Sequence, residues 1–335
     1  VGHGALFTQN PSGNADMNNT AVGHDAGNQV TTGLRNTLIG ALAGDAITTA
    51  TNNIALGYSS ISSNTTSSNN VAVGNLALNT FNITTGGDGY NVAVGTSAGG
   101  AVTTGVNNTL IGGLAGDALT DADQNVAVGT FTLSSDTLGS KTTAIGYGAL
   151  FAQNFTTATD TYNTAVGHNA GTAVTTGQYN TLIGADAGDA LTTGSSNTAV
   201  GYFALSAEDA HGLNTAIGSR ALGNQNAGAV GYNTAVGADA GLSVTTGVQN
   251  TLIGALAGDA ITDADFNVAV GYLSLSTETL GSKSVAIGQT ALRNQNFTTA
   301  TEVFNTAVGH SAGTSVTTGF YNTLIGGLAG DALTD

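Results

Sequence analysis

A five-residue motif, Asn-Thr/Val-Ala/Leu-Val/Ile-Gly, constrains the fold of this chain more than any other feature. It occurs 18 times between Asn19 and Gly326, for example as NTLIG at residues 36–40. In sequence number, the step from one closing glycine to the next is 17, as from Gly23 to Gly40, except that every fourth step is 21 and once 19. Four steps therefore make a unit of 72, or of 70 in one case. A short fixed period of this kind predicts stacked repeats in which each unit contacts only its neighbours.

Each repeat is called a coil here, and its positions are numbered from the closing glycine, which is position 0. Position −1 is Val or Ile, with Leu56 as the exception, and position −3 is Thr, Val or Ile. Position −2 is always Ala or Leu. The β-branched residues favour a short strand, in which −3 and −1 share one face and −2 lies on the other. We predict that −3 and −1 face the interior of the coil and that −2 faces outward.

The outward face of this predicted strand carries no polar residue, so both faces need cover. The sequence contains no apolar stripe with a helical period, and helices are therefore not expected to supply that cover. Alanine predominates at −2 and indicates close approach of a second chain. The sequence thus predicts an all-β, parallel β-solenoid that self-associates. It also predicts that aspartate at Ala93 or Ala165 breaks the association of chains while the coils still form.

Three further patterns describe the coil. Asparagine occupies position −4 in 16 coils and is replaced by Thr142 and Ser284 in the other two, which predicts an asparagine ladder along the stack. An aliphatic residue at position +7 predicts a second strand. The fourth coil of each unit carries four extra residues, which predicts a loop on one side of the stack. The residues at +7 that carry the second prediction are Val30, Ile47, Val102 and Leu119.

The repeat overrules the two globular domains that a length of 335 residues would suggest, and we expect one continuous array over residues 1–335. Eighteen coils spaced by about 4.8 Å would make a rod of roughly 85 Å, with loops about 19 Å apart. The chain begins and stops in mid-motif, so we expect it to be a window of a longer fibre. No signal peptide is visible in it.

Composition excludes several classes of function. The chain has five Lys and Arg residues and a net charge of −16, which opposes nucleic-acid binding. No apolar run approaches the roughly 18 residues of a membrane span, so no membrane insertion is expected in this segment. Cysteine is absent, which excludes disulfides and cysteine-ligated zinc. An acidic, cysteine-free chain rich in Thr, Asn and Gly favours an extracellular, cell-surface or virion-surface location.

Residues with metal-binding chemistry are spread along the stack rather than gathered. His24, His168 and His310 follow the closing glycine and are expected to face solvent. His24 and His168 lie two units apart, about 38 Å, so they cannot share a metal ion within one chain. The aspartates of the second coils, within AGDA, are expected to lie in turns and to accept backbone N–H bonds. These aspartates are Asp45, Asp117, Asp189, Asp259 and Asp331.

Calcium is the one ion that the sequence leaves open. Three closely spaced carboxylates would suit Ca²⁺, and GGDG at residues 86–89 resembles half of a calcium-binding repeat. Other units replace two of the three carboxylates, so such a site would not be essential to folding. We predict no catalytic, cofactor-binding or metal site. The two carboxylate clusters are Asp117, Asp121, Asp123 and Asp259, Asp263, Asp265.

Enzymatic activity is not expected. No Ser/His/Asp set, phosphate-binding loop or zinc motif can be assembled, and a repeat separates the groups that an active site must bring together. The length of the coil also breaks the strict hexapeptide period of the hexapeptide acyltransferases. Ice binding by threonine ladders remains an alternative, although Val and Ile replace Thr at −3 in several coils.

Residues 214–222, NTAIGSRAL, resemble the head repeats of trimeric autotransporter adhesins of the YadA type. The same style of repeat occurs in bacterial and phage-like tail-fibre proteins, and the resemblance covers essentially the whole chain. It implies a left-handed parallel β-roll, three identical chains packed side by side, and a role in a surface fibre or adhesin. Repeats of the YadA type are shorter and lack the four-coil unit.

The sequence predicts the structural shaft of a homotrimeric extracellular or virion surface fibre, a stiff spacer without cofactors. The alternative is an adhesin head whose inserted loops bind a host-surface glycan or protein. End-to-end association into a filament remains open as well, because a bare solenoid end exposes an open sheet edge.

Overall fold

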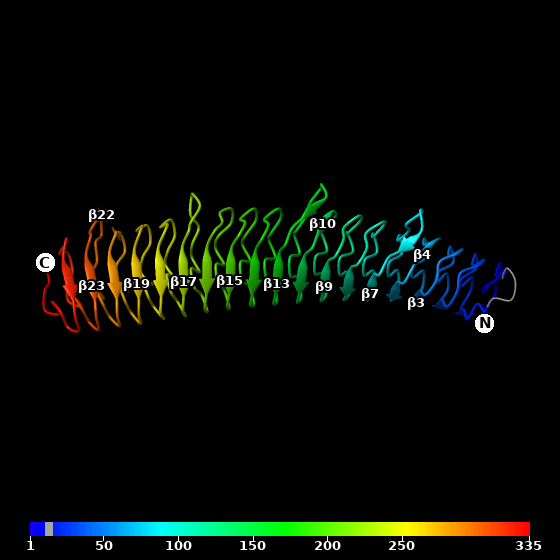
Figure 1. The fold of residues 1–335 in the computed structure, drawn as a ribbon, viewed down its shortest axis with the longest axis horizontal. Helices are drawn as coiled ribbons and strands as arrows, with labels where there is room; N and C mark the ends of the chain where they lie inside the picture. The colour runs from blue at the N-terminus through cyan, green and yellow to red at the C-terminus, as the bar shows by residue number, and fades with distance from the viewer. Residues whose placement is uncertain (11–15) are drawn as a thin grey trace. The chain divides into compact units, whose positions relative to one another are not determined.

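The computed structural model describes residues 1–10 and 16–335. These residues form short strands joined by turns and contain no helix, and hence none with the length and apolarity that crossing a membrane requires. The chain divides into two compact units, Val1–Asn163 and Thr164–Asp335, and in each the strands follow one another in chain order (Figure 1). A single continuous array over residues 1–335 stays a prediction.

The principal strands of the first unit coincide with positions −3 to −1 of the motif. Neighbouring strands pair in parallel, and their partners are one step of the motif apart in sequence, as Thr20 with Thr37, or one longer step apart across an insertion, as Val71 with Val92. The all-β parallel solenoid is therefore confirmed for this unit. Its principal strands are β1 (Thr20–Val22), β2 (Thr37–Ile39), β3 (Ile54–Leu56), β5 (Val71–Val73), β7 (Val92–Val94), β8 (Thr109–Ile111), β9 (Val126–Val128) and β11 (Thr143–Ile145).

The second unit has the same construction. Its strands pair in parallel with the same register, and the one irregular step of the motif is accommodated by pairing Thr215 with Thr234. Its principal strands are β13 (Thr164–Val166), β14 (Thr181–Ile183), β15 (Thr198–Val200), β16 (Thr215–Ile217), β17 (Thr234–Val236), β18 (Thr251–Ile253), β19 (Val268–Val270), β21 (Val285–Ile287), β23 (Thr306–Val308) and β24 (Thr323–Ile325).

Three of the four inserted loops pair with the coil before them, whereas the loop before Gly237 contains no strand. Three pairs of two-residue strands make this contact, each in parallel register. The three insertions of four residues thus each form a small accessory sheet. The pairs are β4 (Ser67–Ser68) with β6 (Gly87–Asp88), β10 (Gly139–Ser140) with β12 (Thr159–Asp160), and β20 (Gly281–Ser282) with β22 (Thr301–Glu302).

The predicted second strand at position +7 is wrong. Val30, Ile47, Val102 and Leu119 are fully buried, yet none lies in a strand. The N–H of Val30 donates to the carbonyl of Gly27 within the same coil, at 3.1 Å. Because this turn uses the N–H locally, it is not free to join a ladder with the next coil.

The predicted orientation of the principal strand is also wrong, because the two faces are exchanged. Position −2 lies inside the coil: Ala93, Leu110 and Ala165 have no exposed surface. Position −1 lies outside, and Ile111 is 38% exposed. The alternation of side chains along the strand identifies two faces but does not say which is inner. The interior of so short a coil is narrow, so it accepts the mostly small residues of position −2 and not the β-branched residues of −1 and −3. Aspartate at Ala93 or Ala165 would therefore disrupt the coil itself.

Leucine and glycine exchange places inside successive coils, and this exchange fills the core. In a second coil, Leu110 stands at −2 and Gly116 at +4, where a β-carbon would lie 2.9 Å from the leucine Cδ2. In the following third coil, Ala127 stands at −2 and Leu133 at +4, both buried. Each coil thus has room for one large side chain at these two positions, in keeping with the close packing of protein interiors.

The first coil of each set of four has no leucine at position −2 or +4. Leucines from the two adjacent coils fill this space instead. A β-carbon on Gly99 would lie 2.7 Å from Leu110 Cδ1 of the next coil and 3.0 Å from Leu78 Cδ2 of the previous one. The Ala-Gly pair of first coils therefore marks the place where leucines from both sides meet. The same arrangement recurs at Gly241, between Leu222 and Leu252.

The predicted asparagine ladder is present at position −4. Asn91, Asn108 and Asn125 are fully buried. The Oδ1 of Asn108 accepts the backbone N–H of Asn125 at 2.9 Å, and its Nδ2 donates to the carbonyl of Ala122 at 2.8 Å. The ladder is thus made mainly of bonds between side chains and backbone. It satisfies the buried polar groups of the chain where one coil passes into the next.

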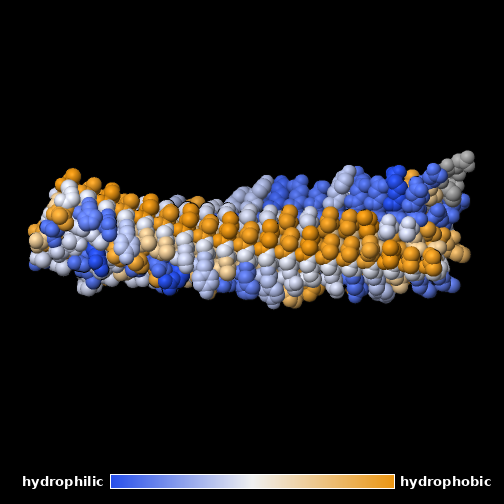
Figure 2. Space-filling view, turned by 90° about the horizontal axis from the view of Figure 1, so that it is seen from below, coloured by the Kyte–Doolittle hydropathy of each residue, from blue (hydrophilic) through white to orange (hydrophobic). Residues whose placement is uncertain are grey.

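The outward side of the sheet leaves a stripe of β-branched residues uncovered in each unit. Hydrophobic residues form rows along the stacked coils on the face seen in Figure 2. Position −1 is at least 37% exposed at several isoleucines, and position −3 is mostly half-buried. The isoleucines in question are Ile39, Ile111, Ile145, Ile183, Ile217, Ile253 and Ile287.

Candidate functional sites

The histidines that follow the closing glycine lie on the surface, as predicted. The side chains of His24 and His168 are 62% and 59% exposed. His24 has a partner that sequence reasoning missed, because His3 occupies the same position one coil earlier. The rings of His3 and His24 stack with centroids 5.4 Å apart and an interplanar angle of 14°. The signal in the sequence was Val1-Gly2, the last two residues of the motif, and Gly2 has a φ of +141°, close to the +137° of Gly23.

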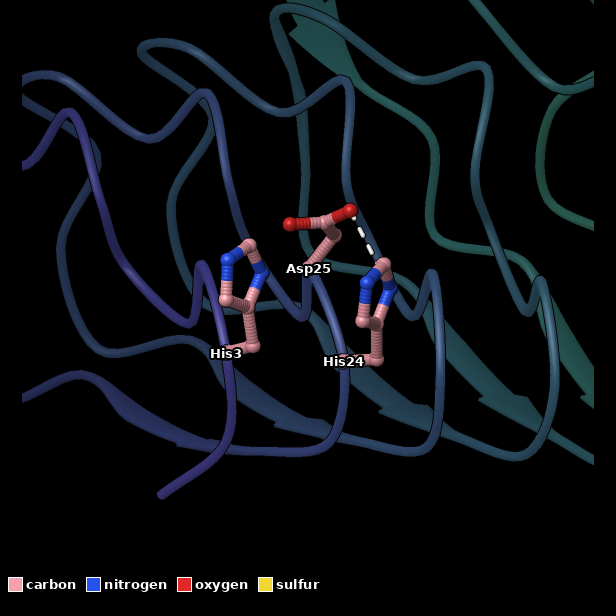
Figure 3. A group of neighbouring side chains, drawn as sticks. All are labelled: His3, His24 and Asp25. Atoms are coloured by element: carbon pink, nitrogen blue, oxygen red, sulfur yellow. Dashed lines mark ion pairs between the residues drawn. The ribbon is translucent and has the colours of Figure 1, made fainter.

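A carboxylate completes this cluster, which we call the His3 cluster (His3, His24 and Asp25; Figure 3). Asp25 Oδ2 lies 3.1 Å from His24 Nδ1. One potential ligand atom from each of the three residues lies within 4.8 Å of the others. The side chains come from two consecutive coils, and the backbone N–H of Asp25 donates to the carbonyl of His3 at 2.8 Å.

A second group of titratable residues, Glu208, Asp209 and His211, surrounds a buried carboxylate. Glu208 has no exposed surface. Its Oε1 accepts the backbone N–H of His211 at 3.1 Å and lies 3.3 Å from the ring Nδ1 of the same residue. Its Oε2 faces Gln225 Nε2 at 3.4 Å. Both carboxylate oxygens thus already have partners in the chain.

Glu208 belongs to a recurring pair that sequence reasoning missed: a carboxylate at +7 of a third coil and glutamine at +7 of the fourth. In the first unit, Gln153 Nε2 donates to Asp136 Oδ2 at 2.6 Å and to Thr142 Oγ1 at 3.1 Å. The backbone N–H of Phe155, in the inserted loop, donates to Asp136 Oδ1 at 3.0 Å. The carboxylate therefore holds the base of the loop. The signal was the replacement of an aliphatic residue at +7 by a polar one.

Glu278 and Gln295 repeat this network in the second unit. Gln295 Nε2 donates to Glu278 Oε2 at 2.8 Å and to Ser284 Oγ at 3.1 Å. Glu278 Oε1 accepts the N–H groups of Gly281 and Phe297 at 2.7 and 3.0 Å. Thr142 and Ser284, the two hydroxyls that replace asparagine at −4, thus accept a hydrogen bond from the glutamine, whereas the coil with Gln225 keeps Asn214 at this position.

The aspartates of AGDA lie in turns, as expected, but they are incompletely satisfied. Burial raises the pKa of Asp45, Asp117, Asp189 and Asp259, and hydrogen bonds to each residue's own backbone partly offset this rise. In each of the four, Oδ1 is buried and has no hydrogen-bond partner. The desolvated oxygen disfavours the charged carboxylate.

The two predicted carboxylate clusters do not converge in the part of the chain that the structure describes. Asp121 Oδ1 accepts the hydroxyl of Thr104, and Asp123 Oδ1 accepts the N–H of Val106 at 2.7 Å. Asp263 and Asp265 make the same bonds in the second unit. Neither cluster brings three ligand atoms within 4.8 Å of one another. The carboxylates bind the neighbouring coil instead.

A ladder of aromatic rings and a lysine lines one corner of the second unit. Lys283 Nζ lies 6.0 Å from the ring centroid of Phe266 and 5.3 Å from that of Phe304. Phe304 stacks on Tyr321 with centroids 5.5 Å apart and rings nearly parallel at 7°. Lys283 also forms an ion pair with Glu302. A pocket of about 210 Å³ opens between Phe266, Lys283 and the accessory strand β22.

Comparisons with known proteins provide no identity. No protein-family model matches the chain, and no curated protein matches it.

Proposed function

We propose that the chain forms the shaft of an extracellular or virion surface fibre in which copies associate side by side through their sheet faces. The observation that carries this proposal is the uncovered stripe of Val and Ile at position −1. Each outward residue stands above its equivalent in the next coil, as Ile111 pairs in register with Val128. Water is displaced from such a surface at a gain of roughly 25 cal/mol per Å² of apolar area.

A second chain is still needed to cover the strand, although its inner and outer faces are exchanged. The strand is apolar on both sides, its inner side is covered by the coil, and its outer side needs cover. Copies of this chain offer matching apolar stripes with few charges to oppose contact, since Lys, Arg, Asp and Glu make up 8% of residues. The resemblance to adhesin head repeats favours three copies and a left-handed β-roll.

The four-coil unit gives the proposed shaft its surface pattern. With coils about 4.8 Å apart, inserted loops would recur at about 19 Å along a rod of roughly 85 Å. The continuous backbone ladders and the asparagine ladder favour a stiff spacer. An acidic, cysteine-free composition supports a location outside a cell. Catalysis has no part in the proposal.

Sedimentation equilibrium combined with electron microscopy tests this proposal. We expect particles of a single multiple of the chain mass, and rods of about 85 Å or multiples joined end to end. Sedimentation as a monomer over the whole accessible concentration range would overturn association through the sheet face. Long threads would add end-to-end pairing at the open sheet edges.

The pocket beside Lys283 favours a second candidate, a binding module that uses the inserted loops. Exposed rings at Phe266 and Phe304, with the adjacent Lys283 and Glu302, combine an apolar surface with hydrogen-bonding groups suited to a host glycan. Phe297 is 8% exposed and anchors its loop, so shortening that loop would also disturb the fold. Binding on a glycan array that is lost in Phe266→Ala would support this candidate.

A further inference from the structure

The His3 cluster combines the side chains that first-row divalent metal ions prefer. Two imidazoles and a carboxylate are common zinc ligands, and three protein ligands leave room for water at the remaining position. Neither the fibre proposal nor the solenoid itself requires this combination at the surface. Among the described residues, the other group with three convergent ligand atoms, around Glu208, already uses its carboxylate for protein contacts.

The distances suit a single ion after small side-chain movements. Bonds of about 2.0–2.2 Å to a tetrahedral zinc ion place two ligand atoms roughly 3.3–3.6 Å apart. The atoms of His3, His24 and Asp25 lie within 4.8 Å of one another before any ion is added. His3 is exposed, as is most of His24, so their rings turn without disturbing the core.

A hydrogen bond from Asn28 holds the carboxylate in place. Asn28 Nδ2 donates to Asp25 Oδ1 at 3.1 Å and also reaches the carbonyl of Gly4 at 3.2 Å. This leaves Asp25 Oδ2 directed at His24. An outer hydrogen bond of this kind orients a metal ligand and strengthens binding.

We propose that His3, His24 and Asp25 form a surface site for a divalent transition-metal ion, for which Zn²⁺ is the best match. Each histidine supplies one ring nitrogen and Asp25 supplies one carboxylate oxygen, with water completing the coordination. The ion links two consecutive coils, so its binding stabilises this end of the first unit. The site is independent of association through the sheet face.

His310 provides a control within the same chain. It occupies the same position after a closing glycine, but the equivalent residues of the adjacent coils are Gln289 and Gly327. Its ring Nδ1 lies 3.2 Å from Ser311 Oγ. One imidazole without a second histidine or a carboxylate is not expected to hold zinc.

Isothermal titration of Zn²⁺ into the whole chain tests the site. For this titration the chain is prepared with the α-amino group of Val1 acetylated, because a free amine two residues before His3 would offer a competing ligand. We expect one equivalent to bind, His24→Ala and His3→Ala each to weaken binding by at least about tenfold, and His310→Ala to leave it unchanged. Mg²⁺ is expected not to bind, because it prefers oxygen ligands.

Thermal unfolding of the same variants supplies a second readout. Zn²⁺ should raise the unfolding midpoint of the wild type and of His310→Ala but not of His24→Ala, whose exposed ring can be removed without opening the core. Absence of zinc binding to the wild type, or equal weakening by His310→Ala and His24→Ala, would overturn the proposal. Either result would leave the sheet-face association untouched.

Discussion

The carbonyl oxygen of Gly129 lies 2.4 Å from the position that a β-carbon on Gly112 would occupy. Gly112 also has a φ of +140°, which L-residues with a side chain rarely adopt. The same relationship links most closing glycines to the closing glycine of the next coil. The glycine of the motif is therefore required by the close approach of stacked coils as well as by its turn.

Replacing Gly112 with alanine should destabilise the first unit severely. The new β-carbon would force the backbones of two coils apart, in addition to a conformational cost of about 1–3 kcal/mol. Thermal unfolding followed by circular dichroism measures the effect. Gly113→Ala is the matched control, since its β-carbon would meet nothing within 4 Å. Equal unfolding midpoints for the two variants would contradict this account of the motif.

Asn108→Ala should lower the free energy of unfolding by about 2–6 kcal/mol. The change leaves the buried N–H of Asn125 and the carbonyl of Ala122 without partners, at roughly 1–3 kcal/mol each. Chemical denaturation measures the loss. Asn107→Gly alters an exposed neighbour whose φ of +60° suits glycine, and it should change stability by less than about 0.5 kcal/mol.

The double variant Ile111→Lys, Val128→Glu should dissociate the chains without unfolding them. The two residues face outward and pair in register, so the opposite charges can interact across the strands. We expect the association constant to fall at least about tenfold by sedimentation, since charges would be buried at the interface. Leu110→Lys, by contrast, should disrupt the coil. An unchanged oligomer in the folded double variant would argue for another interface.

The half-buried aspartates of AGDA make stability depend on pH. Burial raises the pKa of Asp45, Asp117, Asp189 and Asp259, so the folded chain binds protons at these sites more strongly than the unfolded chain. Their contribution to stability therefore falls as pH rises through the window between the ordinary Asp pKa and the raised one. Above that window the loss of stability caused by the charged aspartates no longer changes with pH.

Changing all four aspartates to asparagine should raise the unfolding midpoint at about pH 7, because the desolvated charges are removed. The advantage over the wild type should shrink as pH falls toward about 4, where the aspartates become protonated. Unfolding midpoints measured across this range provide the test. A constant or growing difference on acidification would show that the charges are not the cause.

The sequence alone predicted the strands, their parallel stacking and the loop positions, because each follows from the period of the motif. The asparagine ladder followed in the same way from the stacking of equivalent positions, although its bonds run mainly between side chains and backbone. The predictions failed on the faces of the principal strand and on a second strand at position +7. Ala93 and Val94 alternate in either orientation, and only the width of the coil decides which points inward.

The candidate sites were harder to predict because they depend on contacts between coils. His3 follows an incomplete motif, so its pairing with His24 was not recognised. Asp136 and Gln153 belong to different coils and face each other only after the coils stack. Their signal, a polar residue where an aliphatic one is usual, becomes meaningful once position +7 is known to be buried.

The exchange of leucine and glycine inside the coils restricts how the molecule can change in length. If the coil that carries Gly99 were looped out, Leu78 and Leu110 would compete for the space that this glycine leaves open. Insertion of a single coil would open a void or a clash of the same kind. Adding or removing a complete set of four coils keeps every contact between adjacent coils. Such a molecule therefore changes in length by sets of four coils rather than by single coils.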